Sequence, residues 1–123
     1  MTPTLLIAFA GLMGAAGVIL LAAGAHGLHA GAGLDSAGQM LLFHAAAVIA
    51  AAAALHAGLL LRPLALAAAI GLIVGAVLFS GDIALRAFAG HRLFPMAAPT
   101  GGFVMIASWL GLAVAAIMTF VRG

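Results

Sequence analysis

Residues 64–88 read LALAAAIGLIVGAVLFSGDIALRAF, a stretch whose only charged residues are Asp82 and Arg86, both near its end. A helix needs about 20 predominantly apolar residues to cross the hydrocarbon core of a bilayer. The stretch meets that length, and it contains no Pro that would break a helix. It therefore predicts a membrane-spanning helix over residues 64–88.

The rest of the chain has the same character. Further apolar segments cover residues 4–25, 37–61 and 100–121. Short links containing Gly or Pro separate them, and Ser36 with Gln39 has the spacing of a capping box at the start of the second segment. The sequence predicts one domain over residues 1–123, an all-α integral membrane four-helix bundle with short loops.

The composition excludes several classes of protein. Hydrophobic residues make up 67% of the chain and charged residues 5%, whereas a soluble domain carries about 25% charged residues. Four Lys and Arg against two Asp and Glu give a net charge of +2, too small for a nucleic-acid-binding patch. The chain has no Cys and no Glu, which excludes thiolate metal sites and the HExxH motif. We predict no catalytic residue and no enzymatic activity.

Small residues recur at helical spacing on these segments, as they do where membrane helices pack closely. One stripe of residues 64–88 carries Gly71, Gly75, Leu78, Asp82 and Arg86. The first and last segments offer Gly14, Gly17, Gly101 and Ser108. We expect these positions to lie between helices and Asp82 to point into the bundle.

Asp82 is the most informative residue, because a charge at bilayer depth costs about 2.5–3.5 kcal/mol on insertion scales. Arg86 follows one helical turn later and can pair with it. The two residues fit a local ion pair that fixes helix packing, a proton or cation site, or a charge that faces a partner. The sequence leaves these three interpretations open.

Four histidines are expected toward one side of the membrane: His26, His29, His44 and His91. Of these, His26 and His44 join Gln39 as candidate polar groups inside the membrane. Clustered His can bind a transition metal, and haem needs two His at matched depth, for which His26 with His44 is the candidate pair. Packing or interfacial histidines are the simpler interpretation, so we predict no metal site and no cofactor.

Basic residues suggest an orientation. Four spans place both termini on one side together with Arg62 and Arg122, opposite Arg86 and Arg92. Pairing of Arg86 with Asp82 would weaken the contribution of Arg86 to the count of positive charges. We therefore expect both termini in the cytoplasm.

Several short motifs follow one another along most of the chain. They are Gly24-Ala25-His26-Gly27-Leu28, Gln39 with His44-Ala45, Leu78-Phe79-Ser80-Gly81, and Pro99-Thr100-Gly101-Gly102 with Trp109-Leu110. In this order they resemble the domain-of-unknown-function 423 family of small bacterial inner-membrane proteins. The resemblance implies four spans, a location in the bacterial inner membrane, and no assigned activity.

The resemblance also marks family-type positions, which are His26, Gln39, His44, Ser80, Gly81, Thr100, Gly101, Gly102 and Trp109. The chain departs from the family pattern at Asp82, where a small polar residue is usual, and at Ser108, where Gly commonly precedes the Trp. If Asp82 is peculiar to this chain, a family-wide ion-translocation role cannot depend on it.

These observations favour an accessory, assembly or structural subunit that works through helix–helix contacts in a homo-oligomer or a larger membrane complex. The alternative is a small oligomeric transporter or channel with Asp82 and His44 on a proton or cation route. A further alternative is a haem- or metal-binding module through His26 and His44. The expected partners are the lipid bilayer and copies of this chain or other membrane-protein subunits, and no nucleic acid.

Overall fold

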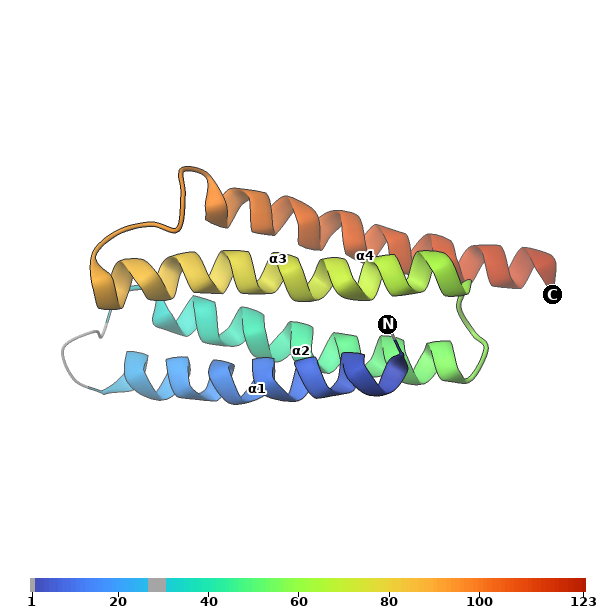
Figure 1. Cartoon of the computed structure of the whole chain (residues 1–123), viewed down its shortest axis with the longest axis horizontal. Helices are drawn as coiled ribbons and strands as arrows, with labels where there is room; N and C mark the ends of the chain where they lie inside the picture. Colours follow the sequence, from blue (N-terminus) through green and yellow to red (C-terminus); the bar gives the residue numbers. More distant parts are fainter. Residues whose placement is uncertain (1, 27–30) are drawn as a thin grey trace.

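The computed structural model describes residues 2–26 and 31–123. In these residues the chain forms four α-helices: α1 (Pro3–Ala25), α2 (Leu34–His56), α3 (Arg62–Ala89) and α4 (Ala97–Arg122). They alternate in direction, so both termini and the link between α2 and α3 lie at one end of the bundle (Figure 1). The all-α four-helix architecture predicted from the sequence is confirmed.

The start of α2 differs from the sequence prediction. The helix begins at Leu34 rather than near residue 37, because Gly33 adopts a left-handed backbone conformation with a φ of 84° and makes the N-cap without a side-chain hydrogen bond. The predicted capping box of Ser36 and Gln39 is therefore wrong, since both residues lie inside the helix.

The other ends shift for similar local reasons. α2 stops at His56 instead of residue 61, and Gly58 turns the chain with a φ of 78° shortly afterwards. α4 begins at Ala97 instead of residue 100, so Pro99 occupies its first turn rather than preceding it. The first N–H groups of a helix have no partner within the helix, so a proline there removes no hydrogen bond.

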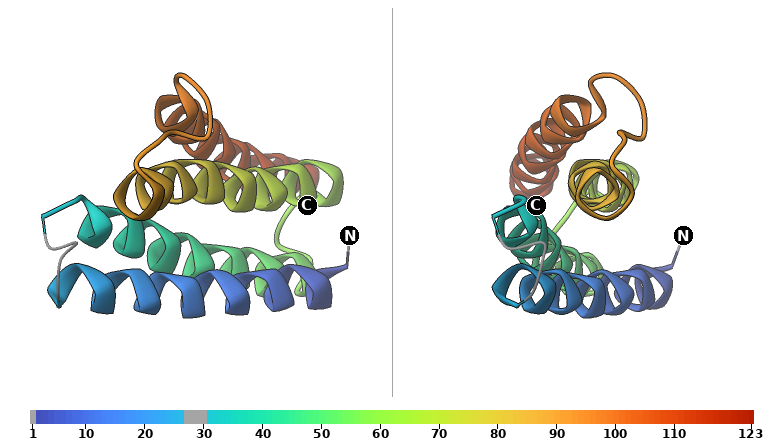
Figure 2. Two further views of the ribbon diagram at one scale, coloured as in Figure 1. Left: turned by 60° about the vertical axis from the view of Figure 1, so that its left-hand side comes forward. Right: turned by 90° about the vertical axis from the view of Figure 1, so that its left-hand side faces the viewer.

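The helices pair as two antiparallel hairpins, α1 with α2 and α3 with α4, and α2 packs on α3 to join them. α1 has far fewer contacts with α3 than with α2. Viewed along the bundle, α1 and α4 lie on opposite outer sides (Figure 2). Leu6 of α1, Val48 of α2 and Leu72 of α3 are completely buried and form the centre of the core.

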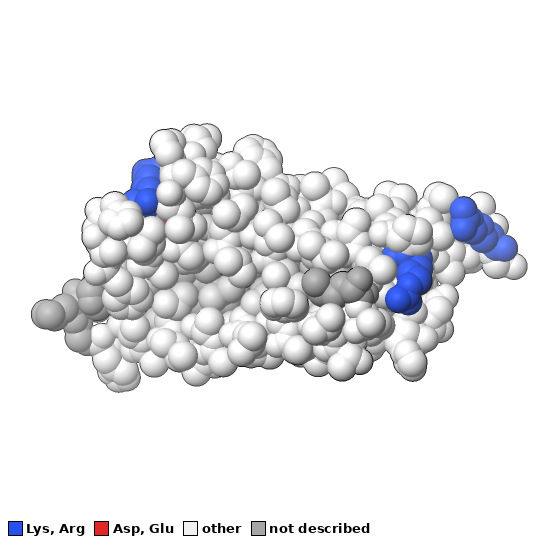
Figure 3. Space-filling view, in the orientation of Figure 1, with Lys and Arg blue, Asp and Glu red and all other residues white. Residues whose placement is uncertain are grey.

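The surface of the bundle is apolar. All four helices are long and apolar enough to cross a membrane by length and composition. Large side chains point outward, such as Leu12, Phe103 and Phe120, which are 69%, 71% and 84% exposed. Basic side chains lie only toward the two ends in the view of Figure 3, and no acidic side chain reaches that face. This distribution is that of a multi-pass membrane protein.

Candidate functional site

Each hairpin contains one crossing at which glycine backbones touch. A Cβ added to Gly101 of α4 would lie 2.6 Å from the Gly75 carbonyl oxygen and 2.7 Å from the Phe79 backbone nitrogen of α3. A Cβ added to Gly17 of α1 would lie 2.9 Å from the Gly38 carbonyl oxygen of α2. These separations are too short for a real side chain, so glycine is required for the helices to approach this closely.

Other predicted packing residues lie along the same seams with different amounts of space. Gly71 faces the side chain of Ser108, whose hydroxyl donates to the Val104 carbonyl oxygen at 2.7 Å. A Cβ at Gly14 would meet the Ala45 side chain at 3.8 Å, which is ordinary van der Waals contact. Gly14 therefore has room for a methyl group that Gly71 lacks.

Asp82 lies on the α3 stripe one turn before Arg86, and its side chain is completely buried. Its Oδ1 accepts a hydrogen bond from the Leu93 backbone N–H at 3.0 Å, and its Oδ2 lies 3.4 Å from an Arg86 side-chain nitrogen. The ion pair lacks hydrogen-bond geometry, so Oδ2 has no hydrogen-bond partner. A Cβ at Gly81 would meet the Leu93 side chain at 3.7 Å. The hydrogen bond from Leu93 to Asp82 thus holds the α3–α4 link against α3, about two turns before that helix ends.

Two further hydrogen bonds connect separate elements. The Ser80 hydroxyl of α3 donates to the Ala37 carbonyl oxygen of α2 at 2.8 Å, and both residues are completely buried. The Leu61 N–H, just before α3, donates to the Ala115 carbonyl oxygen of α4 at 3.1 Å. Both bonds hold α2, α3 and α4 in register, and because Ser80 and Ala37 are buried, water cannot replace a lost partner there.

His44 connects α2 to α4. Its Nδ1 lies 2.8 Å from the Met40 carbonyl oxygen, and its Nε2 lies 3.1 Å from the indole nitrogen of Trp109. A carbonyl only accepts and an indole N–H only donates, so Nδ1 carries the proton and Nε2 accepts. The two rings meet edge to face with their centroids 5.9 Å apart. Both ring nitrogens are engaged, which leaves no lone pair for a metal.

The candidate haem pair of His26 and His44 is wrong, because the two residues lie at different depths. Ala45, next to His44, packs against Gly14 of α1. His26 follows about three turns later along α1, which is about 18 Å at a rise of about 1.5 Å per residue. His44 therefore lies near mid-membrane and not at the polar end where the sequence analysis placed it.

The remaining polar candidates are dispersed. His26, Gln39 and His91 are exposed, and the Nδ1 of His91 lies 3.1 Å from the Arg92 carbonyl oxygen. His29 lies outside the described residues. Within residues 2–26 and 31–123, no three His, Cys, Asp or Glu side chains come close enough together to hold a metal ion.

Sequence reasoning missed the partners of these polar groups. His44 and Trp109 were both marked as family-type positions, and an imidazole acceptor with an indole donor at bilayer depth is a signal that could have paired them. The bonds of Leu93 to Asp82 and of Leu61 to Ala115 use backbone N–H groups. Their partners depend on the path of each link, so no residue type indicates them.

These contacts define a small multi-pass membrane protein whose buried polar side chains join helices and links. A family model described as "Protein of unknown function (DUF423)" matches residues 13–102, and the chain belongs to this family. The match includes Ser80, Asp82 and Gly101 and ends before Trp109. The chain matches no curated protein and no solved structure.

Proposed function

We propose that this chain is a structural or accessory subunit that acts through helix–helix contacts with copies of itself or with other membrane proteins. A row of mostly small residues on α1, exposed in the described chain, carries the proposal. Its members alternate in steps of three and four residues: Thr4, Ala8, Gly11, Ala15, Val18, Ala22 and Ala25. We call this row the outward α1 face.

α1 presents three faces about 120° apart, at about 100° per residue. One face, with Gly14 and Gly17, packs on α2. A second, with Phe9 and Leu20, borders α3. The third is the outward α1 face, where a Cβ added to Gly11 would have no neighbour within 4 Å. Rows of small residues let membrane helices approach closely, and steps of three and four suit a left-handed crossing.

The buried polar side chains support the same proposal, because each has a partner inside the chain. Asp82 accepts a hydrogen bond from the Leu93 N–H, and Ser80 donates one to α2. His44 accepts one from the Trp109 indole. Polar groups used in this way stabilise one arrangement of helices. They leave the outer surface of the bundle as the part that can act on other molecules.

The alternative is an oligomeric transporter with Asp82 and His44 on a proton or cation route. One observation favours it, since Oδ2 of Asp82 is buried without a hydrogen-bond partner and could accept a proton or a cation. Asp82→Asn separates the two proposals. A structural subunit would keep its assembly, whereas a transporter would lose proton-coupled uptake in liposomes.

The proposal places the chain in the bacterial inner membrane with both termini in the cytoplasm, and includes neither enzymatic activity nor a cofactor. Arg86 pairs with Asp82, so Arg62 and Arg122 at the terminal end outweigh Arg92 at the other end. A fluorescent protein fused after residue 123 should fluoresce, and an alkaline phosphatase fused there should be inactive. The reverse pattern would overturn this orientation.

Cysteine cross-linking tests the proposed function, because the chain has no Cys of its own. Ala15→Cys and Ala22→Cys on the outward α1 face should give disulfide-linked dimers, or adducts with a partner protein, when membranes are mildly oxidised. Ala113→Cys, exposed on α4, is the matched control and should not. Equal cross-linking at all three positions, or none at Ala15 and Ala22, would contradict the proposal.

A further inference from the structure

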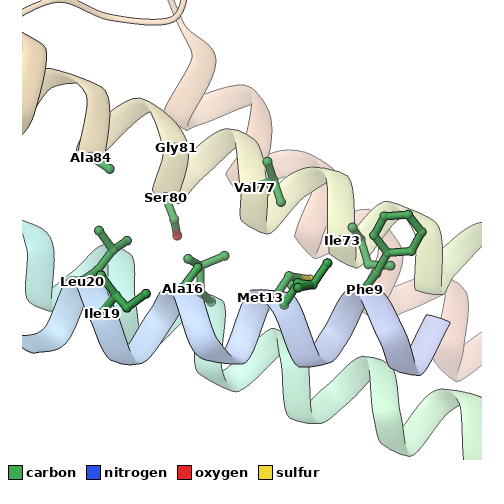
Figure 4. Close-up of a pocket in the computed structure, with 12 residues that line it drawn as sticks. Phe9, Met13, Ala16, Ile19, Leu20, Ile73, Val77, Ser80, Gly81 and Ala84 are labelled. Atoms are coloured by element: carbon green, nitrogen blue, oxygen red, sulfur yellow. The ribbon is translucent and has the colours of Figure 1, made fainter. Parts of the chain in front are cut away.

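A groove of about 450 Å³ lies between α1 and α3 (Figure 4). Leu41 of α2 lines it together with residues of both helices, and the small residues Ala16, Ser80, Gly81 and Ala84 leave the space open. Few contacts join α1 to α3, so the two helices are separated here rather than packed. We call this feature the α1–α3 groove, and it uses a different face of α1 from the outward α1 face.

The groove has the length of one membrane leaflet. It extends from Phe9 and Ile73 to Leu20 and Ala84. Each of these helix segments is about 16 Å long at about 1.5 Å per residue. That is about half of the hydrocarbon core of about 30 Å. The end at Leu20 and Ala84 lies about 8 Å before the C-terminal ends of α1 and α3. The α3 wall therefore lies mostly in the leaflet at that end, whereas the α1 wall continues about 8 Å past Gly14, the midpoint of α1.

We propose that the α1–α3 groove binds one acyl chain of a phospholipid from that leaflet. Helix axes in contact lie about 10 Å apart, so the open strip offers roughly 160 Å². A stable protein interface buries about 800 Å² on each partner, five times more than this strip provides. A helix of a second copy is also about 10 Å across, too wide to enter between α1 and α3.

The chemistry of the walls fits a hydrocarbon chain. The groove volume of about 450 Å³ is many times the space that one water-sized group needs, so a chain of methylene groups fits into it. Ser80 is the polar side chain among the lining residues, and its hydroxyl already donates to the Ala37 carbonyl oxygen. The bound chain fills the gap between α1 and α3 and takes the place of direct contact between them.

The proposal is tested with substitutions that fill the α1–α3 groove with larger side chains. In the variant Ala16→Leu with Ala84→Leu, two added branched side chains occupy the space. The control, Ala113→Leu with Ala116→Leu, adds the same atoms at exposed positions of α4. Each protein is placed in bilayers that contain a phospholipid spin-labelled at mid-chain. Electron paramagnetic resonance then counts the motionally restricted lipids per protomer, and the oligomeric state is measured in parallel.

Wild type and control should hold one more restricted chain per protomer than the filled variant. An equal number in all three proteins would overturn the inference. A change of oligomeric state with no loss of restricted lipid would overturn it in favour of a second copy. Ala84→Leu alone gives the same readout if the double variant loses its helix content by circular dichroism. Failure of the α1 cross-links would leave this result unaffected, because the two faces of α1 are separate.

Discussion

The α1·α2 and α3·α4 hairpins are stabilised by different combinations of close packing and hydrogen bonds. Both contain a crossing at which glycine backbones touch, Gly17 with Gly38 and Gly75 with Gly101. The α3·α4 hairpin is also held by hydrogen bonds from the links at both of its ends and from α2 at mid-membrane. Within the described residues, no side-chain hydrogen bond joins α1 to another helix. In the part of the chain that the structure describes, α1 is therefore held by packing.

The difference matters because hydrophobicity does not drive helices together in lipid. Close contact and hydrogen bonds must do so instead, and among the described residues α1 makes close contacts but no side-chain hydrogen bond to another helix. It is also the helix with two open faces, the outward α1 face and the wall of the α1–α3 groove. We infer that α1, which has the fewest hydrogen bonds to the rest of the bundle among the described residues, is the helix that other molecules cover. A neighbouring helix covers the outward α1 face, and a lipid chain covers the α1–α3 groove.

The largest expected loss of stability comes from a substitution that disrupts the α3·α4 hairpin. Gly75→Leu places a branched side chain against the Gly101 backbone and Met105, and should cost more than about 3 kcal/mol or prevent folding. The matched control is Gly102→Leu, because a Cβ at Gly102 has no neighbour within 4 Å. Thermal unfolding in detergent, followed by circular dichroism, measures both variants. An unchanged melting temperature for Gly75→Leu would refute the crossing.

The next largest loss of stability is expected when the hydrogen bond that holds the α3–α4 link against α3 is removed. Asp82→Ala leaves the Leu93 N–H without its acceptor and Arg86 without its ion-pair partner, and should cost about 1–3 kcal/mol. Asp82→Asn keeps an acceptor oxygen and should cost less. Unfolding free energies from denaturant titration in mixed micelles, with hydrogen exchange at Leu93, measure the change. Equal stability of the Ala variant and wild type would show that this hydrogen bond is dispensable.

A smaller effect compares the two glycine crossings directly. An added Cβ at Gly101 would lie 2.6 and 2.7 Å from two backbone atoms, whereas at Gly17 the single backbone atom among the nearest three lies 2.9 Å away. The backbone clash is shorter and double at Gly101, so Gly101→Ala should cost about 1 kcal/mol more than Gly17→Ala. Gly14→Ala, which has room for a methyl group, should be neutral. If the two crossings proved equally sensitive, the contrast between the two backbone clashes would not hold.

The smallest effect concerns the bond between α2 and α4. A double-mutant cycle with His44→Phe and Trp109→Phe should give a coupling energy of about 0.6 kcal/mol, typical of hydrogen bonds between membrane helices. The same titration in mixed micelles measures it. A coupling energy of zero would mean that the two rings stabilise the bundle only by packing.

Much of this fold could be predicted from the sequence, because helix length, hydropathy and small-residue spacing are local properties. The stripe of Gly71, Gly75 and Asp82 was found in this way, and it faces α4 and the link to it. The pairing of Asp82 with Arg86 followed from their spacing of one turn.

What could not be predicted depends on how helices align along the membrane normal. His26 and His44 looked close by their order in the chain, but the register of α1 against α2 separates them by about three turns. The start of α2 was misplaced because the left-handed Gly33 overrode the spacing of Ser36 and Gln39. The outward α1 face was missed although its steps of three and four are visible in the sequence.

The central claim is that the outward α1 face assembles this chain with other helices. The most direct measurement counts protomers by single-molecule photobleaching in liposomes at low protein density, for wild type, Gly11→Leu and Gly102→Leu. Both glycines have open space around them, so both variants should fold, and only Gly11 lies on the outward α1 face. We predict oligomers for wild type and Gly102→Leu, and monomers for Gly11→Leu. Unchanged oligomers for Gly11→Leu, or a monomeric wild type that copurifies with no other membrane protein, would contradict the claim.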